Sequence, residues 1–103
     1  EDFRQFAELL GEHYKHERSV GFYARQLCIT PKYLTTLIKR ISGKSVSEWI
    51  DNYVILEAKT LLKYSNMSVQ EIAYYLNFPN QSFFVSYFKR NAGMSPSQYK
   101  AKK

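Results

Sequence analysis

Two Lys-Arg pairs stand fifty residues apart in this 103-residue chain, at Lys39-Arg40 and at Lys89-Arg90. Ammonium and guanidinium groups donate charge-assisted hydrogen bonds to anionic oxygens, phosphate oxygens above all. One such pair would be an ordinary solvated surface feature. Its recurrence at matching positions favours contact with an anion that itself repeats, so these four cations are our candidates for phosphate contacts.

The pairs belong to a longer internal repeat. The stretch YLTTLIKRISGKSVSEW at residues 33–49 is matched by FFVSYFKRNAGMSPSQY at residues 83–99. The match extends back to a short helix with a central alanine, Ala24 in one copy and Ala73 in the other, and the second copy has one extra residue within NFPN at 77–80. A short helix, a tight turn and a longer helix form a helix-turn-helix motif, whose second helix can lie in the major groove of DNA.

Base reading in the first copy is expected from polar residues near the start of its longer helix. Base edges in the major groove present a pattern of donors and acceptors that such side chains can read. We expect Lys32, Thr35 and Thr36 to face outward. Tyr33 and Phe83, at matching positions of the two copies, are expected to pack inward.

The segments that would position these candidate contact residues all show helical patterns. We therefore predict an all-α fold of seven short helices. Helix starts are indicated by Thr30-Pro31, with the form of an N-cap followed by proline, and by capping boxes at Ser45 with Glu48 and at Ser68 with Glu71. We expect helix starts also near Ser19, Asn80 and Ser95, a left-handed helix end at Gly43, and the end of another helix before Gly93.

Two helix-turn-helix subdomains and a linker helix describe the predicted organisation. We expect the first subdomain at residues 1–44, the linker helix at 45–64 and the second subdomain at 65–103. A helix of about 18 residues is about 27 Å long, and successive major-groove segments on one face of B-DNA lie about 34 Å apart. The duplication therefore predicts two groove readers in one polypeptide.

Composition and charge agree with a small globular domain that binds an anion. Hydrophobic residues make up 45% of the chain, the formal charge is +6 and the sequence pI is about 9.5. Cys28 is the only cysteine, which excludes an internal disulfide and fits the cytoplasm, and we expect it to be a small buried residue. No apolar run reaches membrane-spanning length. Because the first residue is not methionine, we expect a piece of a longer protein.

Metal binding and catalysis are not expected. His13 and His16 could share one helical face, but zinc would need further ligands that the neighbouring sequence does not supply convincingly. There is no glycine-rich phosphate loop, and two nearby histidines with one cysteine do not make a nucleophile, base and orienting group. We therefore expect no metal, no cofactor and no enzymatic activity.

The stretch IAYYLNFPNQSFFVSYFKRNAGMSPSQYK at residues 72–100 resembles the signature of AraC/XylS-type bacterial transcription regulators. The resemblance covers essentially the whole chain. It implies a fold of two homeodomain-like helix-turn-helix motifs joined by a long helix, and sequence-specific binding of double-stranded promoter DNA. Carried onto the second motif, it implies that Gln81, Ser82, Val85 and Ser86 face the bases.

Several residues depart from the family's pattern. Asn77 stands where glycine is usual, which asparagine tolerates because it enters left-handed conformations readily. Ser86 replaces an arginine and Val85 a serine on the second reading helix, so a bidentate guanine contact is lost. Lys100 replaces an arginine, and Val54 replaces a linker-helix arginine, which we expect to leave that surface more apolar.

The expected role is the DNA-binding part of a cytoplasmic transcription regulator, with activation favoured. Its expected partners are promoter DNA, RNA polymerase and an N-terminal sensor or dimerisation domain outside this sequence. The alternative is a helical protein-interaction module with only non-specific DNA affinity, suggested by Val85 and Ser86. Membrane-surface binding is disfavoured because the cations recur at helix ends and do not form one basic face.

Overall fold

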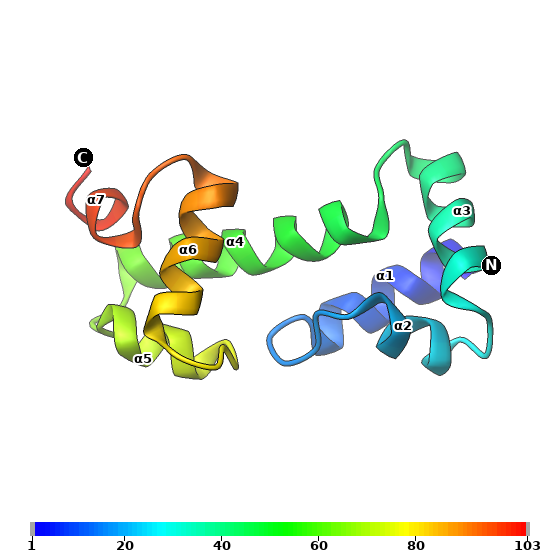
Figure 1. Cartoon of the computed structure of the whole chain (residues 1–103), viewed down its shortest axis with the longest axis horizontal. Helices are drawn as coiled ribbons and strands as arrows, with labels where there is room; N and C mark the ends of the chain where they lie inside the picture. Colours follow the sequence, from blue (N-terminus) through cyan, green and yellow to red (C-terminus); the bar gives the residue numbers. More distant parts are fainter. Residues whose placement is uncertain (1, 103) are drawn as a thin grey trace. The chain divides into compact units, whose positions relative to one another are not determined.

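Seven α-helices and no strands make up the part of the chain that the structure describes, residues 2–102 of this computed structural model (Figure 1). The all-α prediction is confirmed. In chain order the helices are α1 (Asp2–His13), α2 (Val20–Gln26), α3 (Pro31–Ser42), α4 (Val46–Tyr64), α5 (Val69–Tyr75), α6 (Gln81–Ala92) and α7 (Pro96–Ala101).

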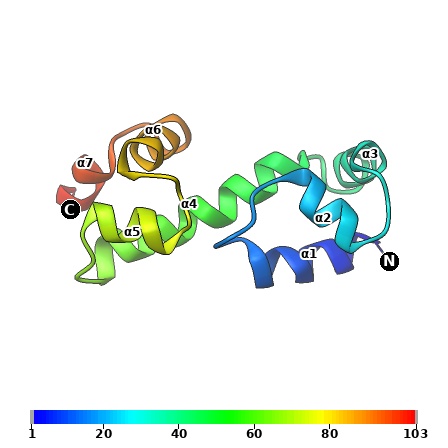
Figure 2. The same cartoon turned by 60° about the horizontal axis from the view of Figure 1, so that its bottom comes forward.

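The chain divides into two compact units, and the division falls inside α4, between Tyr53 and Val54. The first unit contains α1, α2, α3 and the first half of α4. The second contains the rest of α4 with α5, α6 and α7. Each unit holds one helix pair of the repeat, α2 with α3 and α5 with α6, and both pairs can be followed in Figures 1 and 2.

The core of the first unit forms where α2 meets α3 and α1. Ala24 is fully buried, and its small side chain lets α3 approach closely, so that Leu34 and Ile38 are fully buried as well. Tyr23 is also buried. Its ring packs edge-on against Phe6, with centroids 5.7 Å apart, and its hydroxyl donates to the carbonyl of Glu17 at 2.7 Å. Burial raises the pKa of this hydroxyl, which therefore stays a neutral donor.

The second unit repeats this arrangement with aromatic residues. Phe84 and Phe88 are fully buried at the positions of Leu34 and Ile38. The ring of Phe78 lies 5.2 Å from that of Phe84, centroid to centroid. Burial of each such ring stabilises the fold by about 1.5–3 kcal/mol, and each ring pair adds about 0.5–1.5 kcal/mol. These phenylalanines therefore form the centre of the second core.

Helix α4 buries one stripe along its whole length. Ile50, Val54, Ala58 and Leu62 recur every four residues and are at most 2% exposed. The expectation that Val54 lies on an apolar surface is therefore wrong, because the helical period places it on the inward stripe. Trp49, on the same helix, is half-buried and donates from Nε1 to the hydroxyl of Ser42 at 2.9 Å.

Capping boxes begin three of the helices. In α4 the hydroxyl of Ser45 accepts from the amide of Glu48 at 3.1 Å, and the Glu48 carboxylate accepts from the amide of Ser45 at 2.7 Å. Ser68 and Glu71 do the same at α5, which confirms both predicted boxes. At α7 the partner of Ser95 is a glutamine, Gln98, which cannot ionise. The backbone hydrogen bond from Ser45 is the main cause that lowers the pKa of Glu48 below 4.5.

The lowered pKa of Glu48 predicts a pH dependence of stability. Because the folded state holds the carboxylate at a pKa below its unfolded value, the stabilisation is present above about pH 4.5 and is lost as pH falls through the folded pKa. The variant Glu48→Gln keeps a capping group, as Gln98 does at α7. Thermal unfolding followed by circular dichroism should show a smaller loss of Tm between pH 6 and pH 3 for this variant than for the natural chain. An equal loss in both proteins would contradict the assignment.

Candidate nucleic-acid interface

The turn between α2 and α3 reverses the chain through two backbone hydrogen bonds. The amide of Ile29 donates to the carbonyl of Ala24 at 3.0 Å, and the amide of Cys28 donates to that of Arg25 at 3.1 Å. This pair of bonds is the Schellman motif, which requires the residue that donates the second bond to adopt a left-handed conformation. Cys28 takes that conformation, with φ of 60°, and its side chain is exposed. The prediction that Cys28 is buried is therefore wrong, because the turn directs its side chain outward.

The same motif forms in the turn between α5 and α6. The amide of Phe78 donates to the carbonyl of Ala73 at 2.9 Å, the amide of Asn77 donates to that of Tyr74 at 3.0 Å, and Asn77 has φ of 61°. The predicted left-handed role of Asn77 is confirmed. The extra residue of the second copy, Pro79, follows this motif and does not alter it.

Each turn ends in a side-chain cap that starts the next helix. Thr30 accepts through its hydroxyl from the amide of Tyr33 at 3.1 Å, with Pro31 at the first helical position. Asn80 accepts through Oδ1 from the amide of Phe83 at 2.8 Å. Both predicted caps are confirmed. Together the turn and the cap orient the first residues of α3 and of α6, which are the candidate base readers.

Helix α3 buries Leu34, Leu37 and Ile38 and exposes the opposite face. The structure brings all five predicted site residues of the first motif to this exposed face: Lys32, Thr35, Thr36, Lys39 and Arg40. The first three lie on the first two turns and the cations on the last, so a polar surface runs the length of the helix.

Helix α6 shows a matching surface with one difference. Gln81, Ser82, Ser86, Lys89 and Arg90 are exposed, whereas Val85 is half-buried. A shallow groove of about 490 Å³ runs beside the helix and is lined by Asn80, Ser82, Phe83, Ser86 and Arg90; we call it the α6 groove. The Arg90 guanidinium lies 5.5 Å from the ring centroid of Tyr87. Leu37 holds that position in α3, so Arg40 has no ring of this kind and the two cation pairs are not equivalent.

Two exposed aromatic residues were not predicted. Tyr33 is 48% exposed and Phe83 is 57% exposed, at matching positions of α3 and α6, so the prediction that they pack inward is wrong. Their positions precede the buried Leu34 and Phe84 by one residue, about 100° around the helix. If the three buried positions of each helix are projected down its axis, Tyr33 and Phe83 fall outside the buried face. The sequence therefore held the information that these two rings are not core residues.

Charge is distributed unequally between the two units. Residues 1–53 contain eight basic and seven acidic side chains, a formal charge of +1, whereas residues 54–103 contain seven basic and two acidic ones, a charge of +5. The second unit therefore has the stronger attraction for a polyanion.

No group of three or more histidine, cysteine, aspartate or glutamate side chains is placed to share a metal ion within residues 2–102. His13 instead contacts Glu12, with Nε2 and Oε1 3.8 Å apart, and packs edge-on against Phe22. None of the described helices has the length and apolar character needed to cross a bilayer.

Comparison with known families decides what kind of domain this is. The family model described as a helix-turn-helix domain matches residues 23–102, which include both turns, α3, α6 and all of α4. The chain belongs to the AraC-type helix-turn-helix family. The resemblance inferred from residues 72–100 is thereby confirmed.

The similarity of this AraC-type domain to a known regulator extends over nearly the whole chain. It is 27% identical over 99 residues to the arabinose operon regulatory protein of Escherichia coli K12, covering 95% of this chain and 34% of that protein. The chain thus spans about a third of that regulator.

Solved AraC-type structures have the same fold. The C-terminal domain of AraT, a response regulator from Geobacillus stearothermophilus, superposes with a TM-score of 0.92 at 25% identity, covering 99% of this chain and 85% of that one. The DNA-binding domain of the global transcriptional factor AdpA, solved in complex with a target DNA, gives a TM-score of 0.83 at 23% identity, with 95% and 88% covered.

The left-handed conformation of Cys28 predicts that glycine is better than cysteine at this position. Left-handed backbone costs an L-residue about 1–2 kcal/mol and costs glycine nothing, and part of this gain is offset by the extra flexibility of glycine when unfolded. We expect Cys28→Gly to raise the free energy of unfolding by about 0.5–1 kcal/mol in urea titrations. Cys28→Ala, which keeps the strain, is the matched control and should change little. A destabilising Cys28→Gly would contradict this account of the turn.

Proposed function

We propose that this chain is the DNA-binding part of a bacterial transcription regulator and that it binds double-stranded DNA sequence-specifically through α3 and α6. The observation that carries the proposal is the repeated turn, which in both units leaves a helix with a buried apolar face and an exposed polar and cationic one. Membership of the AraC-type family supports it, as does the AdpA domain, whose structure was solved with its target DNA.

In the proposed complex α3 is the main base reader. Lys32 can donate to guanine oxygen and nitrogen acceptors, and the hydroxyls of Thr35 and Thr36 can donate or accept, while their methyl groups suit thymine. Lys39 and Arg40, at the end of the same helix, contact phosphates and hold it in register.

The second unit contributes attraction and positioning more than base discrimination. Gln81 and Ser82 remain able to read bases, but Ser86 is too short for a bidentate contact and Val85 is half-buried. Lys89, Arg90 and the +5 charge of this unit favour phosphate contacts that are independent of sequence. We therefore infer that the two units contribute differently to binding: α3 determines which sequence is bound, and α6 increases the affinity.

The wider setting is part of the same proposal. The full regulator is expected in the cytoplasm, where an N-terminal sensor or dimerisation domain controls this part and RNA polymerase is the downstream partner. Activation of transcription is the favoured outcome. No catalytic activity is proposed, because the exposed faces of α3 and α6 offer hydrogen-bond donors and cations but no activated nucleophile.

Selection from a random double-stranded DNA library tests the proposal directly. A recovered consensus of about two helical turns, with more information in one half than in the other, is the expected result. The alternative, a helical protein-interaction module, predicts equal and purely salt-dependent affinity for all duplexes. This alternative is suggested by Val85 and Ser86, which replace the serine and the arginine that are usual at these positions.

Base reading and positioning can be separated by two substitutions on α3. Thr36→Ala should weaken binding to the preferred site by about 0.5–1.5 kcal/mol, the net contribution of one hydrogen bond, and relax the preference at one position of it. Lys39→Ala should weaken all duplexes alike and reduce the slope of log affinity against log salt by about 1. Fluorescence anisotropy titrations at several salt concentrations measure both effects. Identical behaviour of the two variants would contradict the assignment of their roles.

The exposed ring of Phe83 predicts an apolar contact with thymine from the α6 groove. Phe83→Ala should weaken binding to the preferred site, and replacing the contacted thymine by deoxyuridine should cost the natural chain about 0.8 kcal/mol, the value of one buried methyl group. The same replacement should not affect Phe83→Ala. Tyr33→Ala is the matched change on α3. Equal loss in both proteins on removal of the methyl would exclude the contact.

A further inference from the structure

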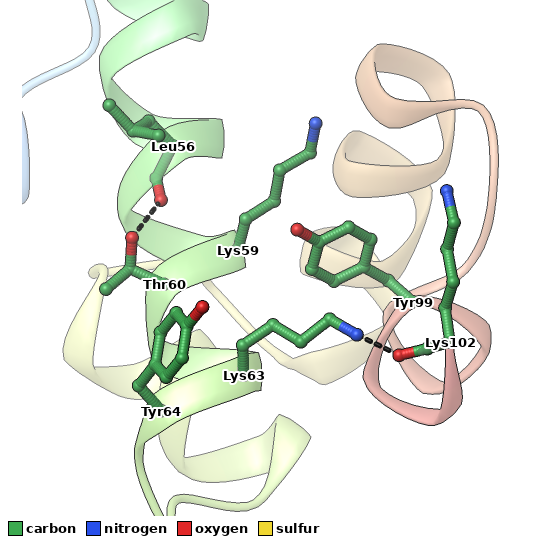
Figure 3. Close-up of a pocket in the computed structure, with 7 residues that line it drawn as sticks. All are labelled: Leu56, Lys59, Thr60, Lys63, Tyr64, Tyr99 and Lys102. Atoms are coloured by element: carbon green, nitrogen blue, oxygen red, sulfur yellow. Dashed lines mark hydrogen bonds between the residues drawn. The ribbon is translucent and has the colours of Figure 1, made fainter.

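A groove lined by lysines lies between α4 and α7 in the second unit, and none of its lining residues is a predicted DNA contact (Figure 3). Its volume is about 550 Å³, and it shares no residue with the α6 groove. We call it the lysine groove; its lining residues are Leu56, Lys59, Thr60, Lys63, Tyr64, Tyr99 and Lys102.

The lysine groove has cations but no acid to neutralise them. The ammonium groups of Lys59 and Lys63 lie 5.6 and 5.1 Å from the ring centroid of Tyr99, and Lys63 also donates to the backbone carbonyl of Lys102. Neither lysine has a carboxylate partner within residues 2–102, and the described lining contains no aspartate or glutamate. The ring of Tyr99 thus gathers two positive charges that remain available to an anion.

Apolar side chains beside these cations argue for a protein ligand. Leu56 is 67% exposed and Tyr64 is 85% exposed, and both lie on α4 at the edge of the groove, as Figure 3 shows. A bare phosphate makes no favourable contact with either side chain. An acidic helix with an apolar residue between its carboxylates would match both the charge and the apolar edge.

The chain itself carries such a helix. In the first unit α1 exposes Glu8 and Glu12, four residues apart as Lys59 and Lys63 are on α4. Carboxylates and ammonium groups with this common spacing can pair one to one. The two glutamates line a groove of about 320 Å³ whose described lining contains no lysine or arginine; we call it the glutamate groove, and its lining residues are Gln5, Glu8, Leu9, Glu12, Gln26 and Leu27.

We propose that the lysine groove of one copy of this chain docks the glutamate groove of a second copy. Lys59 and Lys63 pair with Glu8 and Glu12 of the second copy, and Leu56 enters the glutamate groove. The contact joins two different surfaces, so it is head-to-tail and leaves one of each groove free for a further copy.

Such an association is weak in free solution, because exposed ion pairs contribute little and are screened by salt. Two copies held next to each other on one DNA molecule have a much higher effective concentration, at which a weak contact becomes cooperative. The contact can therefore favour arrays of adjacent sites in one direction. Its existence does not require DNA, so it can be tested apart from the proposed function.

Zero-length carbodiimide coupling of carboxylates to amines, at low salt and without DNA, tests the contact. The natural chain should give a covalent dimer whose linked peptides join residue 8 or 12 to residue 59 or 63. Lys59→Glu with Lys63→Glu, and Glu8→Lys with Glu12→Lys, should each lower the dimer yield about fivefold or more, the effect of losing two exposed ion pairs. Mixing these two variants should restore it, because each supplies the charge that the other lacks.

Matched controls decide between this contact and its alternatives. Lys44→Glu with Lys100→Glu makes the same change in net charge outside both grooves and should leave the dimer yield unchanged. Links to other residues, or no rescue on mixing, would overturn the proposal. So would a loss of affinity for a single DNA site that is larger in Lys59→Glu with Lys63→Glu than in the Lys44→Glu with Lys100→Glu control, because this would make the lysine groove a phosphate contact. Circular dichroism establishes that all variants are folded.

Discussion

One backbone hydrogen bond in each unit determines where the reading helix points. It runs from Ile29 to Ala24 in the first unit and from Phe78 to Ala73 in the second, at 3.0 and 2.9 Å. The bond can form only if the preceding residue is left-handed, and it brings the next helix back across a buried alanine. The exposed faces of α3 and α6, and with them the proposed DNA contacts, all depend on this reversal.

Duplication of this turn has allowed the two units to diverge in chemistry while they keep one geometry. The first unit packs aliphatic residues under α3 and is nearly neutral, whereas the second packs phenylalanines under α6 and has a charge of +5. A stiff aromatic core with strong positive charge suits general attraction to a polyanion. A nearly neutral unit with polar readers suits discrimination, because its affinity depends more on the bases that it meets.

Local chemistry made most of the fold predictable from the sequence. Helix starts follow from caps such as Thr30-Pro31, and the inward faces follow from the helical period, because both depend on residues within one turn of each other. The exposure of Cys28 could not be predicted from residue type, since cysteine is usually buried and only the turn geometry directs it outward. The exposure of Tyr33 and Phe83, in contrast, could have been predicted from the helical period, because three other residues already fill the inward face of each helix.

Dimethyl sulfate interference on a selected binding site tests most directly the claim that both turns present a helix to the major groove of one duplex. Methylation of guanine N7 blocks the major-groove edge without touching the phosphates. The account predicts two clusters of interference about one helical turn apart, the stronger one weakened at the contacted position by substitutions at Thr35 or Thr36. A single cluster that is unaffected by α6 substitutions at Gln81 or Ser82, with no second cluster at any salt concentration, would contradict it.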